Sequence, residues 1–193
     1  MKKILILVLF MFLTVLSPLM AEKIIFSEFG VSYASLITPR TLENNSTGSY
    51  DTAVFDAKLG GTIAKWVDLY AGAGFQFFVD RSNSQEYYTF YPVFAGIRVN
   101  ICPNLLVYPD ICFEYGRAFA NRHSQYEIIP GYNGDRDNTW LADYYNFGFG
   151  LNWNVNDTSV LSLRIERPTY SNLNVSYGEL QIIKTGFAWK ILY

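Results

Sequence analysis

The chain contains one histidine, and it lies among residues that could carry out hydrolysis. His123, Ser124 and Glu127 occur together in the segment NRHSQYE. A histidine can act as a general base, a serine as a nucleophile, and a carboxylate can orient the histidine. In an extended segment, however, adjacent residues point to opposite faces, which separates a nucleophile from its base. A solvated polar loop is therefore the favoured interpretation, and we expect no enzyme active site in this segment.

A larger set of charged side chains shares one pattern, because every member has an even number in the sequence. Such acids and bases could line a path for ions or supply a pair of catalytic carboxylates. They could instead neutralise one another where they would otherwise be buried unpaired. Mutual neutralisation is favoured, because the two signs balance and no pair falls in a catalytic motif. The acids are Glu28, Asp56, Asp110, Glu114 and Glu166, and the bases are Lys58, Arg98, Arg164, Lys184 and Lys190.

The elements that position these residues are predicted from alternating polarity. A period of two is typical of a β-strand whose two faces meet different environments. The pattern recurs in eight segments and continues to Tyr193, although chain termini are usually frayed and polar. The predicted strands are 24–37, 52–63, 69–79, 87–101, 106–119, 140–153, 159–167 and 178–193.

The connections between these strands alternate in length. Long connections at one end and tight turns at the other are typical of an outer-membrane barrel. The sequence therefore predicts an all-β fold, a transmembrane up-and-down antiparallel barrel of eight strands with long extracellular loops and short periplasmic turns. The long connections are 38–51, 80–86, 120–139 and 168–177, and the short ones lie around 65–68, 102–104 and 154–158.

The two faces of the predicted strands differ in chemistry, and side-chain volume decides which face points inward. The odd face is rich in large apolar residues, whereas the even face carries the ten charges and most of the glycines. An eight-stranded barrel is only just wide enough for side chains to fill it. The bulky odd face does not fit in that space. We therefore expect odd positions to face lipid and even positions to face the lumen.

A few odd positions carry charged or interfacial aromatic residues. Arg117, Asp143, Arg167 and Glu179 are expected beside the long loops, where the cost of a charge facing lipid falls towards zero. Aromatic residues near strand ends are expected to form girdles at the two membrane interfaces. They include Tyr33, Tyr91, Tyr115, Tyr145, Trp153 and Trp189.

The first residues predict export. Lys2 and Lys3 precede an apolar run, and Ala21 offers a small residue for cleavage, which together indicate a secretory signal peptide at 1–21. Residues 22–193 then form one barrel domain. Because the net charge is only −2, electrostatics do not favour nucleic acid as a partner.

Export to an oxidising compartment makes a disulfide between Cys102 and Cys112 the first hypothesis to test. Cys102 is expected at a short turn and Cys112 well up the next strand, roughly seven residues away at about 3.3 Å each. That distance exceeds the span of a disulfide. We therefore expect two unpaired thiols, and neither metal-ligand spacing nor a cofactor-binding motif is present in the sequence.

The strands and the ending FAWKILY together resemble the small eight-stranded outer-membrane proteins, such as the OmpA transmembrane domain, OmpX and the opacity-type surface proteins. The resemblance covers about 24–193 and implies an outer-membrane location. It also implies that periplasmic chaperones and the barrel assembly machinery handle the chain. Residues Phe187, Trp189, Ile191 and Tyr193 match the positions of the C-terminal assembly signal.

Three functions are compatible with this resemblance. The first is a structural or surface-interaction barrel with a sealed lumen, which presents its loops to host or envelope molecules within outer-membrane lipid. The second is a narrow transporter of small apolar solutes, as in OmpW-like barrels. The third is a lipid A deacylase, since some barrels of this size use a His, Ser and Glu site. The balanced charges of the even face favour the first.

Overall fold

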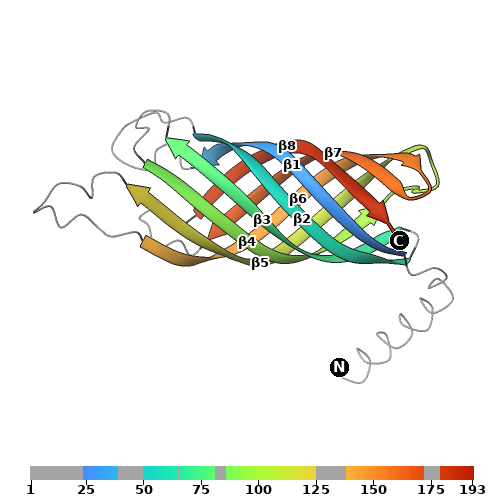
Figure 1. The fold of residues 1–193 in the computed structure, drawn as a ribbon, viewed down its shortest axis with the longest axis horizontal. Coiled ribbons are helices and arrows are strands. Elements are labelled where there is room, and N and C mark those ends of the chain that lie inside the picture. Colours follow the sequence, from blue (N-terminus) through green and yellow to red (C-terminus); the bar gives the residue numbers. More distant parts are fainter. Residues whose placement is uncertain (1–23, 39–49, 65, 81–85, 125–137, 172–178) are drawn as a thin grey trace, which may run out of the picture.

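The computed structural model describes residues 24–38, 50–64, 66–80, 86–124, 138–171 and 179–193, which form eight β-strands (Figure 1). The predicted signal peptide at 1–21 lies outside the described residues. Within the described part of the chain, no helix is long and apolar enough to span a membrane. The strands are β1 (Ile24–Thr38), β2 (Tyr50–Ala64), β3 (Val67–Asp80), β4 (Glu86–Asn100), β5 (Val107–Ser124), β6 (Asn138–Asn156), β7 (Ser159–Ser171) and β8 (Glu179–Leu192).

The strands close into one antiparallel barrel in which sequence neighbours pair and β1 also pairs with β8. Phe29 of β1 lies opposite Ala57 of β2 and opposite Trp189 of β8, so β1 is paired along both edges. Closure lets the strands satisfy their backbone hydrogen bonds with one another, which is what a sheet needs in order to cross a membrane. The predicted all-β up-and-down barrel of eight strands is confirmed.

The two ends of the barrel are distinct. Short connections at 65–66, 101–106 and 157–158 join strands at one end, which we call the turn end. The C-terminal residue, Tyr193, lies at the same end (Figure 1). At the opposite end, the loop end, strands are joined by 39–49, 81–85, 125–137 and 172–178, which lie outside the described residues.

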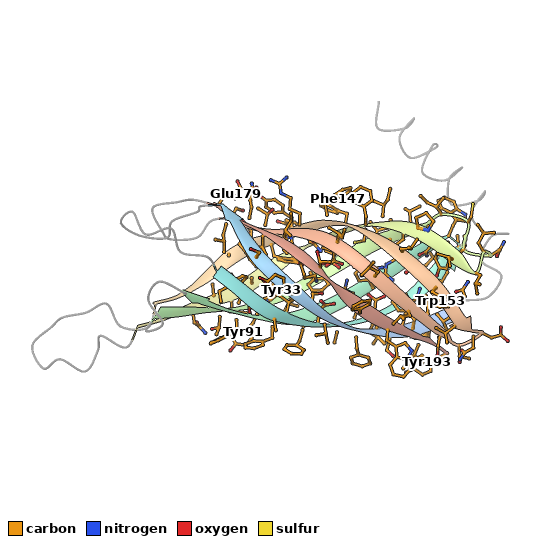
Figure 2. The ribbon with its side chains drawn as sticks, turned by 90° about the horizontal axis from the view of Figure 1, so that it is seen from above. Tyr33, Tyr91, Phe147, Trp153, Glu179 and Tyr193 are labelled. Carbon is orange, nitrogen blue, oxygen red and sulfur yellow. The ribbon has the colours of Figure 1, made fainter. Side chains whose placement is uncertain are left out.

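The two faces of the wall follow the predicted parity. Even positions point into the lumen and are buried, as for Phe26 and Ile182 at 0% exposure, whereas odd positions such as Leu59 and Phe187 are more than 60% exposed. Figure 2 shows Phe147 projecting outward from the wall. A continuous apolar exterior of this size is stable against lipid rather than water. The outward face is therefore the surface that meets the membrane.

Prolines occur inside strands of the barrel, and one of them, Pro168, corrects a predicted boundary. The sequence places Pro168 at the start of a loop, but β7 continues through it to Ser171. Pro168 lies opposite Asn146 in β6, while the ladder between β7 and β8 is interrupted at this position. Pro92 is paired with β5 and interrupts the ladder with β3 in the same way. Because a proline lacks the backbone N–H, it cannot donate a hydrogen bond to a neighbouring strand. It can still lie within a strand where the ladder with one of the two neighbouring strands is interrupted.

The outward charges also depart from the prediction. Glu179 begins β8 beside 172–178, as expected, but Arg117, Asp143 and Arg167 lie inside strands that extend further than predicted. Arg117 and Asp143 are directly opposite each other on β5 and β6, with a nitrogen and an oxygen 2.7 Å apart. Arg167 donates a hydrogen bond to Gln181 of β8. Pairing, in addition to position near the loop end, therefore makes these charges tolerable on the outward face.

Candidate functional site in the barrel lumen

A layer of charged side chains crosses the lumen, and its best-defined contact joins β1 to β4. Arg98 donates through its two terminal nitrogens to Glu28, at 2.6 Å to Oε2 and 2.8 Å to Oε1. Both side chains are at most 1% exposed. Two parallel charge-assisted hydrogen bonds match the planar guanidinium to the carboxylate. Because β1 and β4 are not neighbours in the sheet, this pair ties together separate parts of the wall.

Glu114 of β5 accepts four hydrogen bonds. Lys58 Nζ lies 2.7 Å and the Tyr70 hydroxyl 3.0 Å from Oε1. The Tyr144 hydroxyl lies 2.9 Å and the Asn146 amide nitrogen 2.8 Å from Oε2. The acceptor positions of the carboxylate are therefore filled by side chains from β2, β3 and β6. A carboxylate held in this way can stabilise the lumen, but it leaves little room for a substrate.

The remaining predicted charges join the same layer. Arg164 donates to Asp110 at 2.7 Å, and Lys184 lies 2.9 Å from Asp56 and 2.5 Å from Glu166. Longer contacts of 3.7–3.9 Å connect these pairs to the centre. The structure thus brings nine of the predicted residues into one connected set. The tenth, Lys190, joins it through a residue that the sequence analysis missed.

That residue is Asp68. The sequence places it in a short turn, but β3 begins at Val67 and Asp68 points into the lumen at 0% exposure. Lys190 lies 2.7 Å from its Oδ2, and Arg98 lies 3.8 Å from the same oxygen. Thr62 donates to Asp68 Oδ1, and Asn100 donates to Asp68 Oδ2. Its even number was the signal that could have identified it, since it shares the parity of the other lumen charges.

A second layer, made of aromatic rings, fills the lumen nearer the loop end. Phe78 contacts Phe90 with ring centroids 5.8 Å apart, and Phe90 contacts Tyr170 at 4.7 Å. Tyr170 contacts Tyr144 at 5.4 Å, and Tyr144 contacts Phe94 at 5.4 Å. All five rings are buried. The expectation of a small, glycine-rich even face with a few polar groups was therefore incomplete, because it overlooked aromatic residues at even positions.

Glycines make room for two of the lumen rings in a reciprocal arrangement on β3 and β4. Tyr70 lies opposite Gly96, and Gly72 lies opposite Phe94. A Cβ added at Gly96 would lie 2.6 Å from the Tyr70 ring, and one at Gly72 would lie 2.8 Å from the Phe94 ring. Each ring therefore covers the glycine of the opposite strand, which allows bulky side chains in a narrow barrel. The glycines and the aromatic residues could be read from the sequence, but which glycine lies opposite which ring could not.

The two cysteines are free thiols in the structure, Cys102 exposed at a turn and Cys112 buried in the lumen. Ligand atoms of Cys112, Glu114 and Glu166 lie within 4.8 Å of one another. Arg164 lies 3.5 Å from Glu166 and 3.7 Å from the Cys112 sulfur, while Lys58 contacts Glu114. Positive side chains already neutralise these carboxylates. The cluster is therefore a poor fit for a metal ion.

The weak catalytic candidates lie at the end of β5 and beyond it. The sequence places His123 and Ser124 in a loop, but β5 continues through both, with His123 opposite Tyr87 and Ser124 opposite Glu86. Glu127 lies outside the described residues. Consecutive strand residues project to opposite faces, which is an unsuitable arrangement for a nucleophile and its base.

The chain end is fixed to the first strand. The Tyr193 backbone N–H donates to Ile25 O at 2.8 Å, and its hydroxyl lies 3.0 Å from Ser27 Oγ. Trp189 and Phe187 lie on the outward face of β8, each more than half exposed. Tyr193 and Trp153 are both found toward the turn end in Figure 2. The last residue thus takes part in closing the barrel.

We expect deletion of Tyr193 to lower the amount of folded barrel in the outer membrane, because the deletion removes both contacts with β1. The measurement is the fraction of unheated protein that keeps folded mobility in SDS gels of membrane fractions. Thr185→Ala changes an exposed, outward position of the same strand without removing an outward aromatic residue or a lumen charge, and it should reduce assembly less. Equal assembly of the deletion variant and the parent would contradict an assembly role for this residue.

Solved structures of small outer-membrane barrels share this fold. Neisserial surface protein A is 11% identical, with 89% of this chain and 100% of that chain covered and a TM-score of 0.65. Ail, the attachment invasion locus protein of Yersinia pestis, in complex with the heparin analogue sucrose octasulfate, is 12% identical, with the same coverage and a TM-score of 0.53. No family model matches the sequence, and no curated protein matches it. The chain therefore has the fold of eight-stranded outer-membrane β-barrels.

Proposed function

We propose that the protein is an integral outer-membrane barrel with a lumen closed to solutes, and that it acts at the cell surface through its loop end. The observation that carries this proposal is the filled lumen. Charges pair across the half nearer the turn end, and aromatic rings pack across the half nearer the loop end. In this proposal, periplasmic chaperones and the barrel assembly machinery deliver the chain after removal of 1–21, and lipid covers the outward belt.

The loop-end segments are the proposed interaction surface. Ail has been crystallised with a heparin analogue, which motivates a comparison of charge. The four segments of this chain contain three basic and four acidic residues, so they lack the excess of positive charge that a polyanion requires. We therefore favour host or envelope molecules of low charge as partners. The charged residues are Arg40, Glu43, Arg81, Glu127, Asp135, Arg136 and Asp137.

Transport of small apolar solutes is the second candidate function. The apolar cluster nearer the loop end, which includes Phe78, Phe90 and Ile182, offers suitable chemistry for such a solute. A solute that continued along the barrel axis would next meet the charge layer, where Arg98 and Glu28 are paired across the lumen. The outer-leaflet lipid A deacylase stays the least supported alternative, since the strand backbone at His123 and Ser124 gives unfavourable geometry.

Display of the loop end can be tested with a bulky maleimide that does not cross the outer membrane. In a Cys102→Ser background, Asn83→Cys introduces a thiol in 81–85, and Asp157→Cys introduces one in the β6–β7 turn. We expect labelling of intact cells at position 83 only, and labelling at position 157 after the outer membrane is permeabilised. The opposite pattern would show an inverted barrel, and protection of both positions in intact cells would contradict surface display.

A further inference from the structure

The turn between β4 and β5 presents an unusual surface for a segment facing the periplasm. Leu105 and Leu106 are 56% and 65% exposed, and Ile101 beside them is also exposed. The stretch NICPNLLV at 100–107 contains no charged residue. Trp66 extends the exposed apolar surface to the β2–β3 turn, and Val155 extends it to the end of β6. We call these five residues the apolar rim.

Hydrogen bonds hold the apolar rim together. Asn100 N donates to Trp66 O at 2.7 Å, which ties this turn to the β2–β3 turn. Asn154 Nδ2 donates to Leu105 O at 2.8 Å and to Pro103 O at 3.2 Å, and Asn154 N donates to Leu106 O at 2.9 Å. These hydrogen bonds therefore connect the backbone segments that carry the exposed apolar side chains.

The same hydrogen bonds, with one more within the turn, satisfy four of its carbonyl groups. The carbonyls of Pro103, Leu105 and Leu106 accept bonds from Asn154, and Cys102 O accepts one from Leu105 N at 3.0 Å. Backbone groups that are satisfied internally can leave water at low cost, whereas unsatisfied groups cannot. The β6–β7 turn differs, since it is built from Asn156, Asp157 and Thr158 and is polar.

We infer that the apolar rim inserts into the periplasmic leaflet of the outer membrane, at the boundary between the phospholipid headgroups and the acyl chains. The inference rests on the proposed membrane barrel and adds an anchoring site at one side of its turn end. Continuity supports lipid as the occupant, because Val107 joins the rim to the outward apolar face of β5, and Val155 of the rim follows Trp153 on the outward face of β6. A periplasmic protein is the competing occupant.

Cys102 provides the probe for a direct test, because it is exposed within the turn while Cys112 is buried. An environment-sensitive fluorophore on Cys102 of the parent is measured in phosphatidylcholine vesicles with and without brominated acyl chains. We expect blue-shifted emission that brominated lipid quenches and aqueous iodide does not. The double variant Leu105→Asn with Leu106→Asn should give water-like emission while keeping folded mobility in unheated SDS gels. A Cys102→Ser variant controls for labelling of Cys112.

Two further labels in the Cys102→Ser background separate the possible failures. A label at Asp157→Cys should report water, and a label at Leu163→Cys, on the outward face of β7, should report acyl chains. If the Cys102 label is as exposed to iodide as the label at 157 while the label at 163 reports lipid, the barrel spans the membrane but the rim does not insert. If the label at 163 also reports water, the membrane barrel itself is wrong, and the anchoring site fails with it.

Discussion

Arg98→Ala should be among the most destabilising single substitutions in the barrel, at about 3–5 kcal/mol. The substitution leaves Glu28 buried at 0% exposure without its bidentate partner. The nearest other cations, Lys58 and Arg164, lie 3.7 and 3.9 Å from Glu28 and are already engaged with other carboxylates. The loss is measured as the free energy of unfolding by urea in lipid vesicles, followed by tryptophan fluorescence.

The ion pair between Arg117 and Asp143 on the outward face supplies a matched control. Arg117 also contacts a carboxylate at 2.7 Å, but its side chain is 55% exposed, so Arg117→Ala should cost less than about 1 kcal/mol. The double variant Arg98→Met with Glu28→Gln should cost less than the sum of its two single changes, since neither charge is then left unpaired. Equal losses for Arg98→Ala and Arg117→Ala would contradict the assignment of a buried network.

Gly116→Ala should destabilise the wall by about 3 kcal/mol, at the upper end of the usual range for overpacking. A Cβ at this position would lie 2.0 Å from Val93 O and 2.6 Å from Phe94 Cα. Both atoms belong to the backbone of β4, which pairs with β5 at this point. Relief would require a shift of the sheet itself rather than rotation of a side chain. The same urea unfolding measurement reports the loss.

Gly74→Ala is the control for this substitution, because it also adds one methyl group at an even position. Its Cβ would lie 3.2 Å from Pro92 Cγ and 3.3 Å from Phe55 O, so small adjustments are sufficient. We expect a loss below about 1 kcal/mol. A Gly116→Ala variant as stable as the Gly74→Ala variant would show that β4 and β5 are less closely packed than the structure indicates.

The strands and their two faces could be predicted from the sequence because both depend on local patterns. Alternation identifies a strand, and the limited volume of the lumen excludes the bulky odd face. The predicted strand ends were wrong where pairing with a neighbouring strand overrode a local sequence signal. Pro168 reads as the end of a strand, yet the ladder with β6 continues through it. Asp68 was missed because the predicted turn extended to 68, whereas β3 begins at Val67.

The contacts within the lumen could not be predicted, since they depend on how far each strand is displaced along its neighbour. Glu28 and Arg98 are separated by 70 residues and meet only because closure of the barrel brings their side chains together across the lumen. The aromatic layer was overlooked for a different reason. Tyr144 and Tyr170 share the parity of the charges, but the even face was described by its charges and glycines alone, and its aromatic residues were left out.

Planar-bilayer recording tests the sealed lumen most directly. The parent barrel is inserted into a lipid bilayer, with an open porin added to the same bilayer afterwards as a positive control. We expect no stable conductance from the parent, because paired charges and packed rings occupy the lumen at successive levels. Variants that shorten lumen side chains, such as Arg98→Ala, should give small or flickering events. A large and steady conductance from the parent would contradict the sealed barrel and favour transport as its function.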